Sequence, residues 1–289
     1  MPELPEVEVV RRDLEREIVG KKIKAVDVTG ARAIRRHTEK AGGGKNANGK
    51  KQFTERLVDR KFTGVTRRGK YILCRLDGDD VLVVHLGMSG QLLRAKSSKD
   101  PMAKHTHVVL TFTQGGQLRF VDPRTFGEMF VTSAAEVDQV VGELSHLGID
   151  PLEQAMSWEQ FGFLLRERHS KLKPLLMDQK FIAGIGNIYS DEILWGAGLR
   201  WDHMSDALTG EEVRRLYRSM METLQDAVKH RGSSLADAQY VDLFGNPGEY
   251  QQFHNVYARE GEMCPRCRHV VVREKVGGRS TFYCAACQV

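Results

Sequence analysis

The sequence lacks the features that would assign it to a membrane or secreted class. No apolar run in its 289 residues approaches the roughly 20 residues that a membrane-spanning helix needs. The first six residues, MPELPE, are acidic, whereas a secretory signal is first basic and then apolar. Neither sign of charge dominates, because 43 Lys and Arg face 38 Asp and Glu, so net charge alone identifies no partner. These absences favour a cytoplasmic protein.

The chain is long enough for two domains of ordinary size, each with its own core. Its basic residues are concentrated in two blocks. The first lies between Lys21 and Lys70, and the second closes the chain with Arg273, Lys275 and Arg279. A basic stretch is more often a solvated face than a binding surface. Two such blocks beside a metal motif nevertheless favour a polyanionic partner.

The first part of the chain is predicted to contain one helix followed by strands. Apolar residues at helical spacing lie between Pro5 and Gly20, which suit the first turn and the end of a helix. Runs rich in β-branched residues and separated by glycine turns then predict an antiparallel sandwich or barrel. These runs cover residues 22–28, 62–66, 71–76, 81–86, 106–113 and 117–121. The Gly-, Lys- and Asn-rich stretch 39–52 is predicted to be a surface loop.

After about residue 133 the pattern becomes helical. Two capping boxes, one opening at Ser157 and one at Thr209, predict helices that reach Arg168 and His230. Residues 181–199 predict two helices around a glycine turn, and residues 231–258 predict a long loop.

We therefore expect an α+β protein with four parts. They are a β-sandwich domain at 1–133, a linker at 134–150, a helical domain at 151–258 and a four-cysteine segment at 259–289.

Four cysteines form the strongest single motif. Cys264 and Cys267 are one Cys-x-x-Cys pair, Cys284 and Cys287 are another, and this spacing is typical of a zinc ribbon. Four thiolates complete a tetrahedral shell, so we expect one structural Zn²⁺ that supplies folding energy. Two disulfides are the alternative, which a cytoplasmic setting disfavours. Cys74 lies in an apolar run and is predicted to be a core residue.

The N-terminus offers the components of a covalent mechanism. Removal of Met1 would expose the secondary amine of Pro2, and an α-amine with a pKa of about 7.7–8.0 is partly unprotonated at neutral pH. Such an amine can attack a sugar carbon and form an iminium, while the adjacent Glu3 transfers protons. Considered alone, Glu3 and Glu6 are more simply explained as first-turn acids that the helix dipole favours.

Several motifs in order give the chain a resemblance, over essentially its whole length, to the formamidopyrimidine-DNA glycosylase family (Fpg, or MutM). They are MPELPE at 1–6, HLGMSG at 85–90, DPRTFG at 122–127, GIGNIY at 184–189 and the four cysteines. The related endonuclease VIII branch usually begins MPEGP, so Leu4 favours the Fpg branch.

The resemblance implies an N-terminal helix with a β-sandwich, a helix–two-turns–helix domain and a zinc-ribbon hairpin. It also implies a bifunctional DNA glycosylase and AP lyase of base excision repair. Such an enzyme excises 8-oxoguanine and formamidopyrimidines through a Schiff base on its N-terminal proline, followed by β,δ-elimination. The implied partner is double-stranded DNA with an oxidised purine or an abasic site, and we expect a monomer.

The resemblance also assigns roles to single residues. Pro2 is the nucleophile, Glu3 the proton-transfer residue and Glu6 a supporting carboxylate. The implied DNA contacts are phosphate binding by Lys70, His105, Asn187 and Arg279, filling of the gap left by the flipped base by Met88, Arg124 and Phe126, and a position near the site for Lys173. His107 is expected to be structural.

Other interpretations of these residues remain open. Each of the DNA contacts, considered singly, can be a surface charge, a helix cap or a packing residue. Residues 231–258 are implied to cover the flipped base, and Ser233 stands where many relatives have a second glycine.

Two alternative functions are kept. One is an oxidised-pyrimidine glycosylase of the endonuclease VIII type. The other is a non-catalytic zinc-ribbon protein that binds nucleic acid, which would need basic patches and zinc but no free Pro2 amine beside Glu3.

Overall fold

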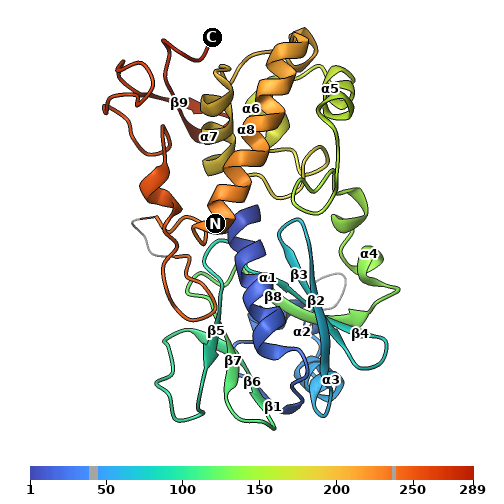
Figure 1. The fold of residues 1–289 in the computed structure, drawn as a ribbon. Helices are drawn as coiled ribbons and strands as arrows, with labels where there is room; N and C mark the ends of the chain where they lie inside the picture. The colour runs from blue at the N-terminus through green and yellow to red at the C-terminus, as the bar shows by residue number, and fades with distance from the viewer. Residues whose placement is uncertain (39–44, 236–238) are drawn as a thin grey trace. The chain divides into compact units, whose positions relative to one another are not determined.

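The computed structural model describes residues 1–38, 45–235 and 239–289, which divide into two compact units (Figure 1). Unit 1 contains residues 1–2, 6–145 and 231–248, and unit 2 contains residues 3–5, 146–230 and 249–289. Within this described part of the chain, no helix combines the length and the hydropathy that a membrane crossing requires.

Unit 1 is built on two antiparallel four-stranded sheets, as the sequence predicts. Their strand orders are β1-β6-β7-β5 and β2-β3-β4-β8. The strands are β1 (Ile23–Val28), β2 (Phe62–Arg68), β3 (Tyr71–Leu76), β4 (Asp80–His85), β5 (Gln91–Ala95), β6 (Thr106–Phe112), β7 (Gln117–Val121) and β8 (Glu128–Ser133). The prediction missed β5 and β8. Strand β5 has no β-branched residue, and the buried run in β8 has no polar alternation to mark it.

Helix α1 (Leu4–Ile18) shares its core with both sheets. Its predicted apolar face is confirmed, because Val7, Val10, Leu14 and Ile18 are all buried in one cluster. Figure 1 shows this helix, in blue, beside the strands of unit 1. Cys74 lies in the same cluster, which confirms it as a core residue.

Short helices follow β1: η1 (Ala31–Ile34), α2 (Arg35–Thr38) and α3 (Gly49–Leu57). The predicted loop 39–52 is therefore wrong at its end, where α3 begins; residues 39–44 lie outside the described part. The Gly, Lys and Asn residues of this stretch led to the prediction of a loop. The apolar Phe53 and Leu57 of α3 are four residues apart and enter the core. Farther along unit 1 come α4 (Val137–Val140) and η2 (Leu144–His146), the last residue of which belongs to unit 2.

Unit 2 is mainly helical. Its elements are α5 (Trp158–Arg166), α6 (Leu172–Leu176), α7 (Asn187–Ala197), η3 (Ser205–Ala207), α8 (Gly210–Lys229) and η4 (Tyr250–Phe253). Both predicted capping boxes are confirmed, at Ser157 for α5 and at Thr209 for α8. The helix before the glycine turn is α6, so the predicted helix start near residue 181 is wrong. The side chain of Gln179 holds this longer turn, because it binds both Gly184 N and the carbonyl of Ile185.

The unit boundaries differ from the predicted domains. The described residues of 231–248, a segment assigned from the sequence to the helical domain, belong to unit 1, where the carbonyl of Leu243 accepts a hydrogen bond from Arg94 N at 2.8 Å. Residues 134–145 of the predicted linker also belong to unit 1. Residues 236–238 of the predicted lesion-covering loop lie outside the described part.

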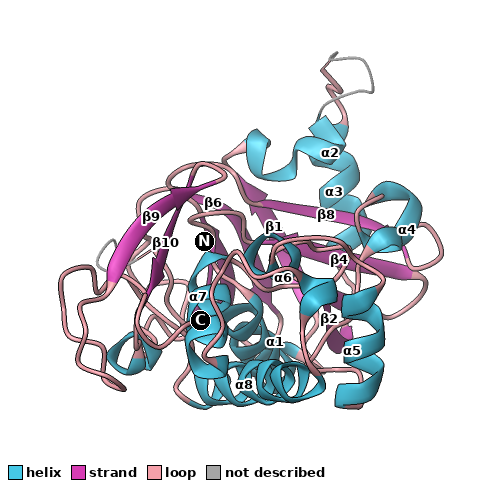
Figure 2. Ribbon diagram, turned by 90° about the horizontal axis from the view of Figure 1, so that it is seen from above, coloured by secondary structure: helices cyan, strands magenta, loops and turns pink. Residues whose placement is uncertain are grey.

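The four-cysteine segment contains a hairpin of β9 (Val272–Val276) and β10 (Arg279–Tyr283), both drawn in magenta in Figure 2. Its two turn residues are Gly277 and Gly278, with φ of 55° and 80°. Two successive positive φ values are typical of a type I′ turn, whose twist matches that of a hairpin. The turn places Arg279 at the first position of β10.

Candidate active site

The side chain of Glu3 is hydrogen-bonded to the backbone at the start of α7. Its carboxylate accepts hydrogen bonds from the backbone N–H of Gly186 at 2.8 Å, of Ile188 at 2.9 Å and of Tyr189 at 3.4 Å. The residue is only 3% exposed. Gly186 is the N-cap of α7 and offers no capping side chain, so Glu3 supplies the acceptor that the first turn requires.

Two glycines make this contact possible. A Cβ on Gly186 would lie 2.5 Å from Cδ of Glu3, and a Cβ on Gly184 would lie 2.5 Å from Cδ1 of Leu4. Gly184 also has a φ of 91°. The anion bound by the backbone amides at this helix terminus is thus the carboxylate of Glu3.

Pro2, the neighbour of Glu3, is buried, whereas Met1 is half-exposed. Glu6 is 1% exposed, and its Oε1 accepts a hydrogen bond from Ser233 N at 2.8 Å. Gly232, with a φ of 78°, leaves room for that carboxylate, because a Cβ there would lie 2.7 Å from Oε1. Arg231 and Gly232 have positive φ but Ser233, the next residue, does not, so a side chain at position 233 is compatible with the backbone. Glu6 therefore anchors the first residues of the predicted lesion-covering loop.

Asp122 organises two loops that carry predicted DNA contacts. It is fully buried and accepts hydrogen bonds from Ser89 Oγ at 2.5 Å and from the backbone N–H of Arg124 at 3.2 Å and of Gly127 at 2.7 Å. These bonds join the loop that contains Met88 to the loop after β7. Asp122 begins the DPRTFG motif, but no role for it was predicted; the signal that could have found it is an acid directly before a Pro-containing turn.

The three side chains predicted to fill the gap are presented to solvent by those loops. Met88 is 38% exposed and Phe126 is 52% exposed, although both are large and apolar, and Arg124 is exposed as well. Exposed apolar side chains grouped on structured loops are typical of a contact surface.

The remaining predicted phosphate contacts of unit 1 lie in turns. Lys70 lies in the two-residue turn between β2 and β3, directly before the strand at whose start it was expected. His105 is exposed and has a φ of 63°, just before β6. His107 has its Nε2 at 2.8 Å from the carbonyl of Asp122, which fits its expected structural role.

In unit 2, Arg279 is exposed and Asn187 is partly buried at the start of α7. Lys173 is only 2% exposed, and its ammonium lies 2.7 Å from a carboxylate oxygen of Asp191. Burial lowers the pKa of Lys173, a shift that the carboxylates of Asp191 and Glu3 oppose. The charge of Lys173 is therefore paired inside the protein, and the expected position near the DNA site stays a prediction.

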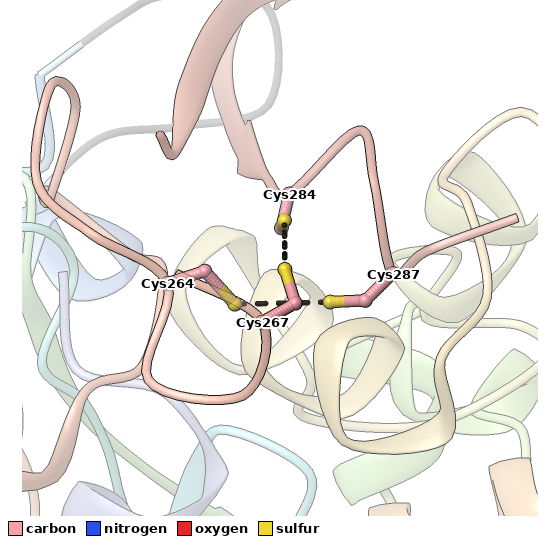
Figure 3. Close-up of side chains that lie close together, drawn as sticks. All are labelled: Cys264, Cys267, Cys284 and Cys287. Carbon is pink, nitrogen blue, oxygen red and sulfur yellow. Dashed lines mark hydrogen bonds between the residues drawn. The ribbon is translucent and has the colours of Figure 1, made fainter. Parts of the chain in front are cut away.

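The four cysteines form one cluster, shown in Figure 3, in which all four Sγ atoms lie within 4.8 Å of one another. The Sγ atoms of Cys264 and Cys287 are 3.7 Å apart, and those of Cys267 and Cys284 are 3.3 Å apart. A tetrahedral shell with Zn–S bonds of about 2.3 Å has sulfur–sulfur distances of about 3.8 Å, so the thiol set fits Zn²⁺.

The indole of Trp195 supports the cluster from α7. Its Nε1–H donates to Sγ of Cys264 at 3.3 Å, a contact that fixes the orientation of a metal ligand.

The predicted site residues divide between the units. Unit 1 contains Pro2, Glu6, Lys70, Met88, His105, Arg124 and Phe126, and unit 2 contains Glu3, Lys173, Asn187, Arg279 and the four cysteines.

Models of known families match three segments of the chain. Residues 1–129 match the formamidopyrimidine-DNA glycosylase N-terminal domain, and residues 147–239 match the H2TH domain of the same glycosylase. Residues 261–289 match the zinc finger found in FPG and IleRS. This match and the geometry of the four thiols identify the cluster as the site of one structural zinc ion.

Curated relatives match the chain over its full length. A formamidopyrimidine-DNA glycosylase of Pelotomaculum thermopropionicum is 42% identical over 288 residues, covering 100% of this chain and 99% of the relative. One from Mycobacterium avium is 43% identical, with 100% of this chain and 98% of the relative covered.

Solved structures agree with these matches. Fpg of Lactococcus lactis, in a complex with DNA that contains an abasic site, gives a TM-score of 0.86 at 34% identity and 99% coverage of both chains. MutM (Fpg) of Thermus thermophilus gives a TM-score of 0.84 at 37% identity, with 99% of this chain and 98% of that chain covered. The chain therefore belongs to the formamidopyrimidine-DNA glycosylase family.

Proposed function

We propose that this protein is a bifunctional DNA glycosylase and AP lyase of base excision repair that excises 8-oxoguanine and formamidopyrimidines. The observation that carries the proposal is the placement of Glu3. Its carboxylate is buried, is oriented by three backbone N–H groups and directly follows Pro2 in the sequence. A carboxyl group fixed beside a secondary amine is the arrangement that proton transfer and covalent attack on a sugar require.

The proposed reaction begins with the amine that removal of Met1 exposes. The nitrogen of Pro2 attacks C1′ of the damaged nucleotide, and the bond from C1′ to the base breaks as the base departs with a proton. Opening of the sugar ring then gives an iminium between Pro2 and C1′. The iminium acidifies the neighbouring sugar protons, so successive β- and δ-eliminations release the phosphates on both sides.

Glu3 is assigned the proton transfers to the ring oxygen and the departing base. Glu6 is assigned a supporting role, since it fixes the loop that begins at Arg231 to α1, the helix that follows Pro2. Any change that moves either carboxylate is therefore expected to slow excision.

The DNA contacts are assigned as the family resemblance implies, and the exposure of His105, Arg124 and Arg279 supports them. Lys70, His105, Asn187 and Arg279 are assigned to phosphates, which basic and amide side chains bind without reading sequence. A base inside a duplex must be flipped out before it can be excised, and the gap must be filled. Met88 and Phe126 are assigned to that gap as apolar wedges, and Arg124 to the orphaned opposite base.

Solved relatives support the substrate class. Lactococcus lactis Fpg has been solved with DNA that contains an abasic site and with DNA that contains N7-benzyl-Fapy-dG. The zinc is assigned a structural role, because four thiolates leave no open position for a reacting water. As part of the proposal, we place the enzyme in the bacterial cytosol as a monomer.

Glu3→Gln tests this function. On a duplex with one 8-oxoguanine, we expect single-turnover excision to fall at least about 100-fold, because an amide cannot transfer the proton. Binding to a duplex with a tetrahydrofuran abasic analogue should survive. Glu15→Gln is the matched control, since it makes the same change on an exposed face of the same helix and should excise normally. Unchanged excision by Glu3→Gln would remove Glu3 from the mechanism.

A further inference from the structure

A buried ion pair joins two helices of unit 2. Lys173 lies in α6 and Asp191 in α7, and their side chains are 3% and 1% exposed. Lys173 Nζ lies 2.7 Å from Oδ1 of Asp191. A buried pair of this kind pays a desolvation cost that apolar residues of similar size would avoid. Packing of the two helices alone therefore does not explain why this ion pair is there.

The same two side chains bind the backbone of strand β10. Lys173 Nζ donates to the carbonyl of Ser280 at 3.2 Å, and Phe282 N donates to Oδ2 of Asp191 at 2.9 Å. Asn187 Nδ2 also donates to the carbonyl of Ser280, at 3.0 Å.

Strand β10 pairs only with β9 among the described strands. Ser280 and Phe282 are two residues apart, so their backbone groups point to the same edge of β10, the edge away from β9. An unpaired strand edge needs both donors and acceptors. The ammonium and the carboxylate supply one of each, which no apolar pair could do.

Arg279 directly precedes the residue that this network holds. Its side chain is exposed, and among the described residues its guanidinium has no hydrogen-bond or ion-pair partner. The two turn glycines, Gly277 and Gly278, have positive φ and directly precede Arg279. The position of Arg279 is therefore fixed from the strand side, where Lys173 and Asp191 bind β10, and its charge remains available to a ligand.

We propose that Lys173 and Asp191 are positioning residues that hold β10 so that Arg279 meets a DNA phosphate. This inference rests on the proposed function. In this role Asp191 and Lys173 affect DNA binding indirectly, through the position of β10.

The test is a double-mutant cycle on DNA binding. The pair variant Lys173→Met/Asp191→Leu leaves no unpaired charge in the interior. Its affinity for a duplex with a tetrahydrofuran site is measured by fluorescence anisotropy at several KCl concentrations, beside wild type, Arg279→Ala and the triple variant. Arg218→Ala removes one exposed charge from α8 and serves as the control.

Arg279→Ala should weaken binding about tenfold and reduce the slope of log K against log[salt] by about 0.9, as for one lost phosphate contact. The pair variant should reproduce both changes, and the triple variant should lose nothing more. Arg218→Ala should match wild type. If the pair variant weakened DNA binding only by destabilising unit 2, it would weaken binding equally in a protein that already carries Arg279→Ala.

The inference is overturned if the pair variant keeps the wild-type slope, if its loss adds to that of Arg279→Ala, or if Arg279→Ala itself binds like wild type. A wild-type protein that does not prefer the tetrahydrofuran duplex over undamaged DNA would instead contradict the proposed function. Zinc content and a thermal melt establish that each variant is folded. If the pair variant fails to fold, Asp191→Asn takes its place, since it keeps an acceptor for Phe282 N and should show a smaller loss that also vanishes without Arg279.

Discussion

Asp122 shows how one buried side chain can control several exposed ones. It contacts no solvent, yet its hydrogen bonds to Ser89, Arg124 and Gly127 set the shape of two loops. Those loops present Met88, Arg124 and Phe126. Asp122 is buried and cannot contact DNA, yet it fixes the loops whose side chains are proposed to enter the DNA.

Asp122→Asn is therefore expected to reduce discrimination between bases opposite the lesion. The amide cannot accept from both Arg124 N and Gly127 N, so one loop should shift, and the free energy of unfolding should fall by about 1–3 kcal/mol. Excision of 8-oxoguanine paired with each of the four bases measures the first effect, and denaturant unfolding measures the second. Asp138→Asn, at a half-exposed site, is the control. Unchanged discrimination would contradict the role given to Asp122.

Because of His37, the free energy of unfolding is expected to depend on pH. Burial, with a contribution from Arg56, lowers the pKa of His37 to about 4, and its Nε2 accepts a hydrogen bond from Val131 N at 2.9 Å. In the unfolded chain the pKa is about 6.5, so the unfolded state binds more protons between these values and stability falls as pH drops from 6.5 towards 4.

His37→Gln removes this titration while keeping an acceptor for Val131 N. From pH 6.5 to pH 4.5, wild type should lose about 1 kcal/mol more free energy of unfolding than the variant, after allowance for the partly exposed ring. Urea unfolding of both proteins at the two pH values measures the difference. Equal losses would show that the ring titrates normally in the folded protein.

At the scale of the element, the start of α7 is built around Glu3. Gly186→Ala would place a Cβ 2.5 Å from Cδ of Glu3 and displace the carboxylate. A displacement of about 1 Å can cost about 100-fold in rate, so excision should fall by that order while zinc is retained.

Gly210→Ala is the matched control for that variant, because a Cβ at Gly210 meets nothing within 4 Å. Single-turnover excision and zinc content are measured for both. Normal excision by Gly186→Ala would mean that the amides of α7 do not orient Glu3 for the reaction.

The four-cysteine segment is expected to need its metal in order to bind DNA. Cys267→Ala should lose zinc and weaken DNA binding, because the hairpin that carries Arg279 depends on the metal for its folding energy. Metal analysis and binding to a tetrahydrofuran duplex measure both effects. Cys74→Ala, a change in the core of unit 1, should retain zinc. Retention of zinc and of binding by Cys267→Ala would refute a structural metal.

Some of these elements could be predicted from local patterns alone. The capping boxes at Ser157 and Thr209, the apolar face of α1 and the spacing of the cysteines each lie within a few residues of sequence. The hydrogen bond between Glu3 and Gly186 could not be predicted, since its partners are 183 positions apart in the sequence and no local pattern indicates it. The ion pair of Lys173 could not be predicted either, because its partner Asp191 lies in another helix.

At the scale of the molecule, the chain alternates between two units. It begins in unit 1, enters unit 2 for residues 3–5, and returns to each unit later. Pro2 and Glu3 are neighbours in sequence whose contacts belong to different units. A sequence divided into consecutive domains could not predict this, because Leu243 binds Arg94 of strand β5, which lies far earlier in the chain.

The proposed activity depends on one chemical event, the formation of an iminium between Pro2 and the damaged sugar. Incubation with an 8-oxoguanine duplex and borohydride would reduce that iminium to a stable amine, and mass spectrometry would locate the cross-link. We predict a single cross-link at Pro2. No trapping on this duplex, on oxidised-pyrimidine duplexes or on abasic duplexes would contradict the proposed mechanism and favour a zinc-dependent protein that only binds DNA.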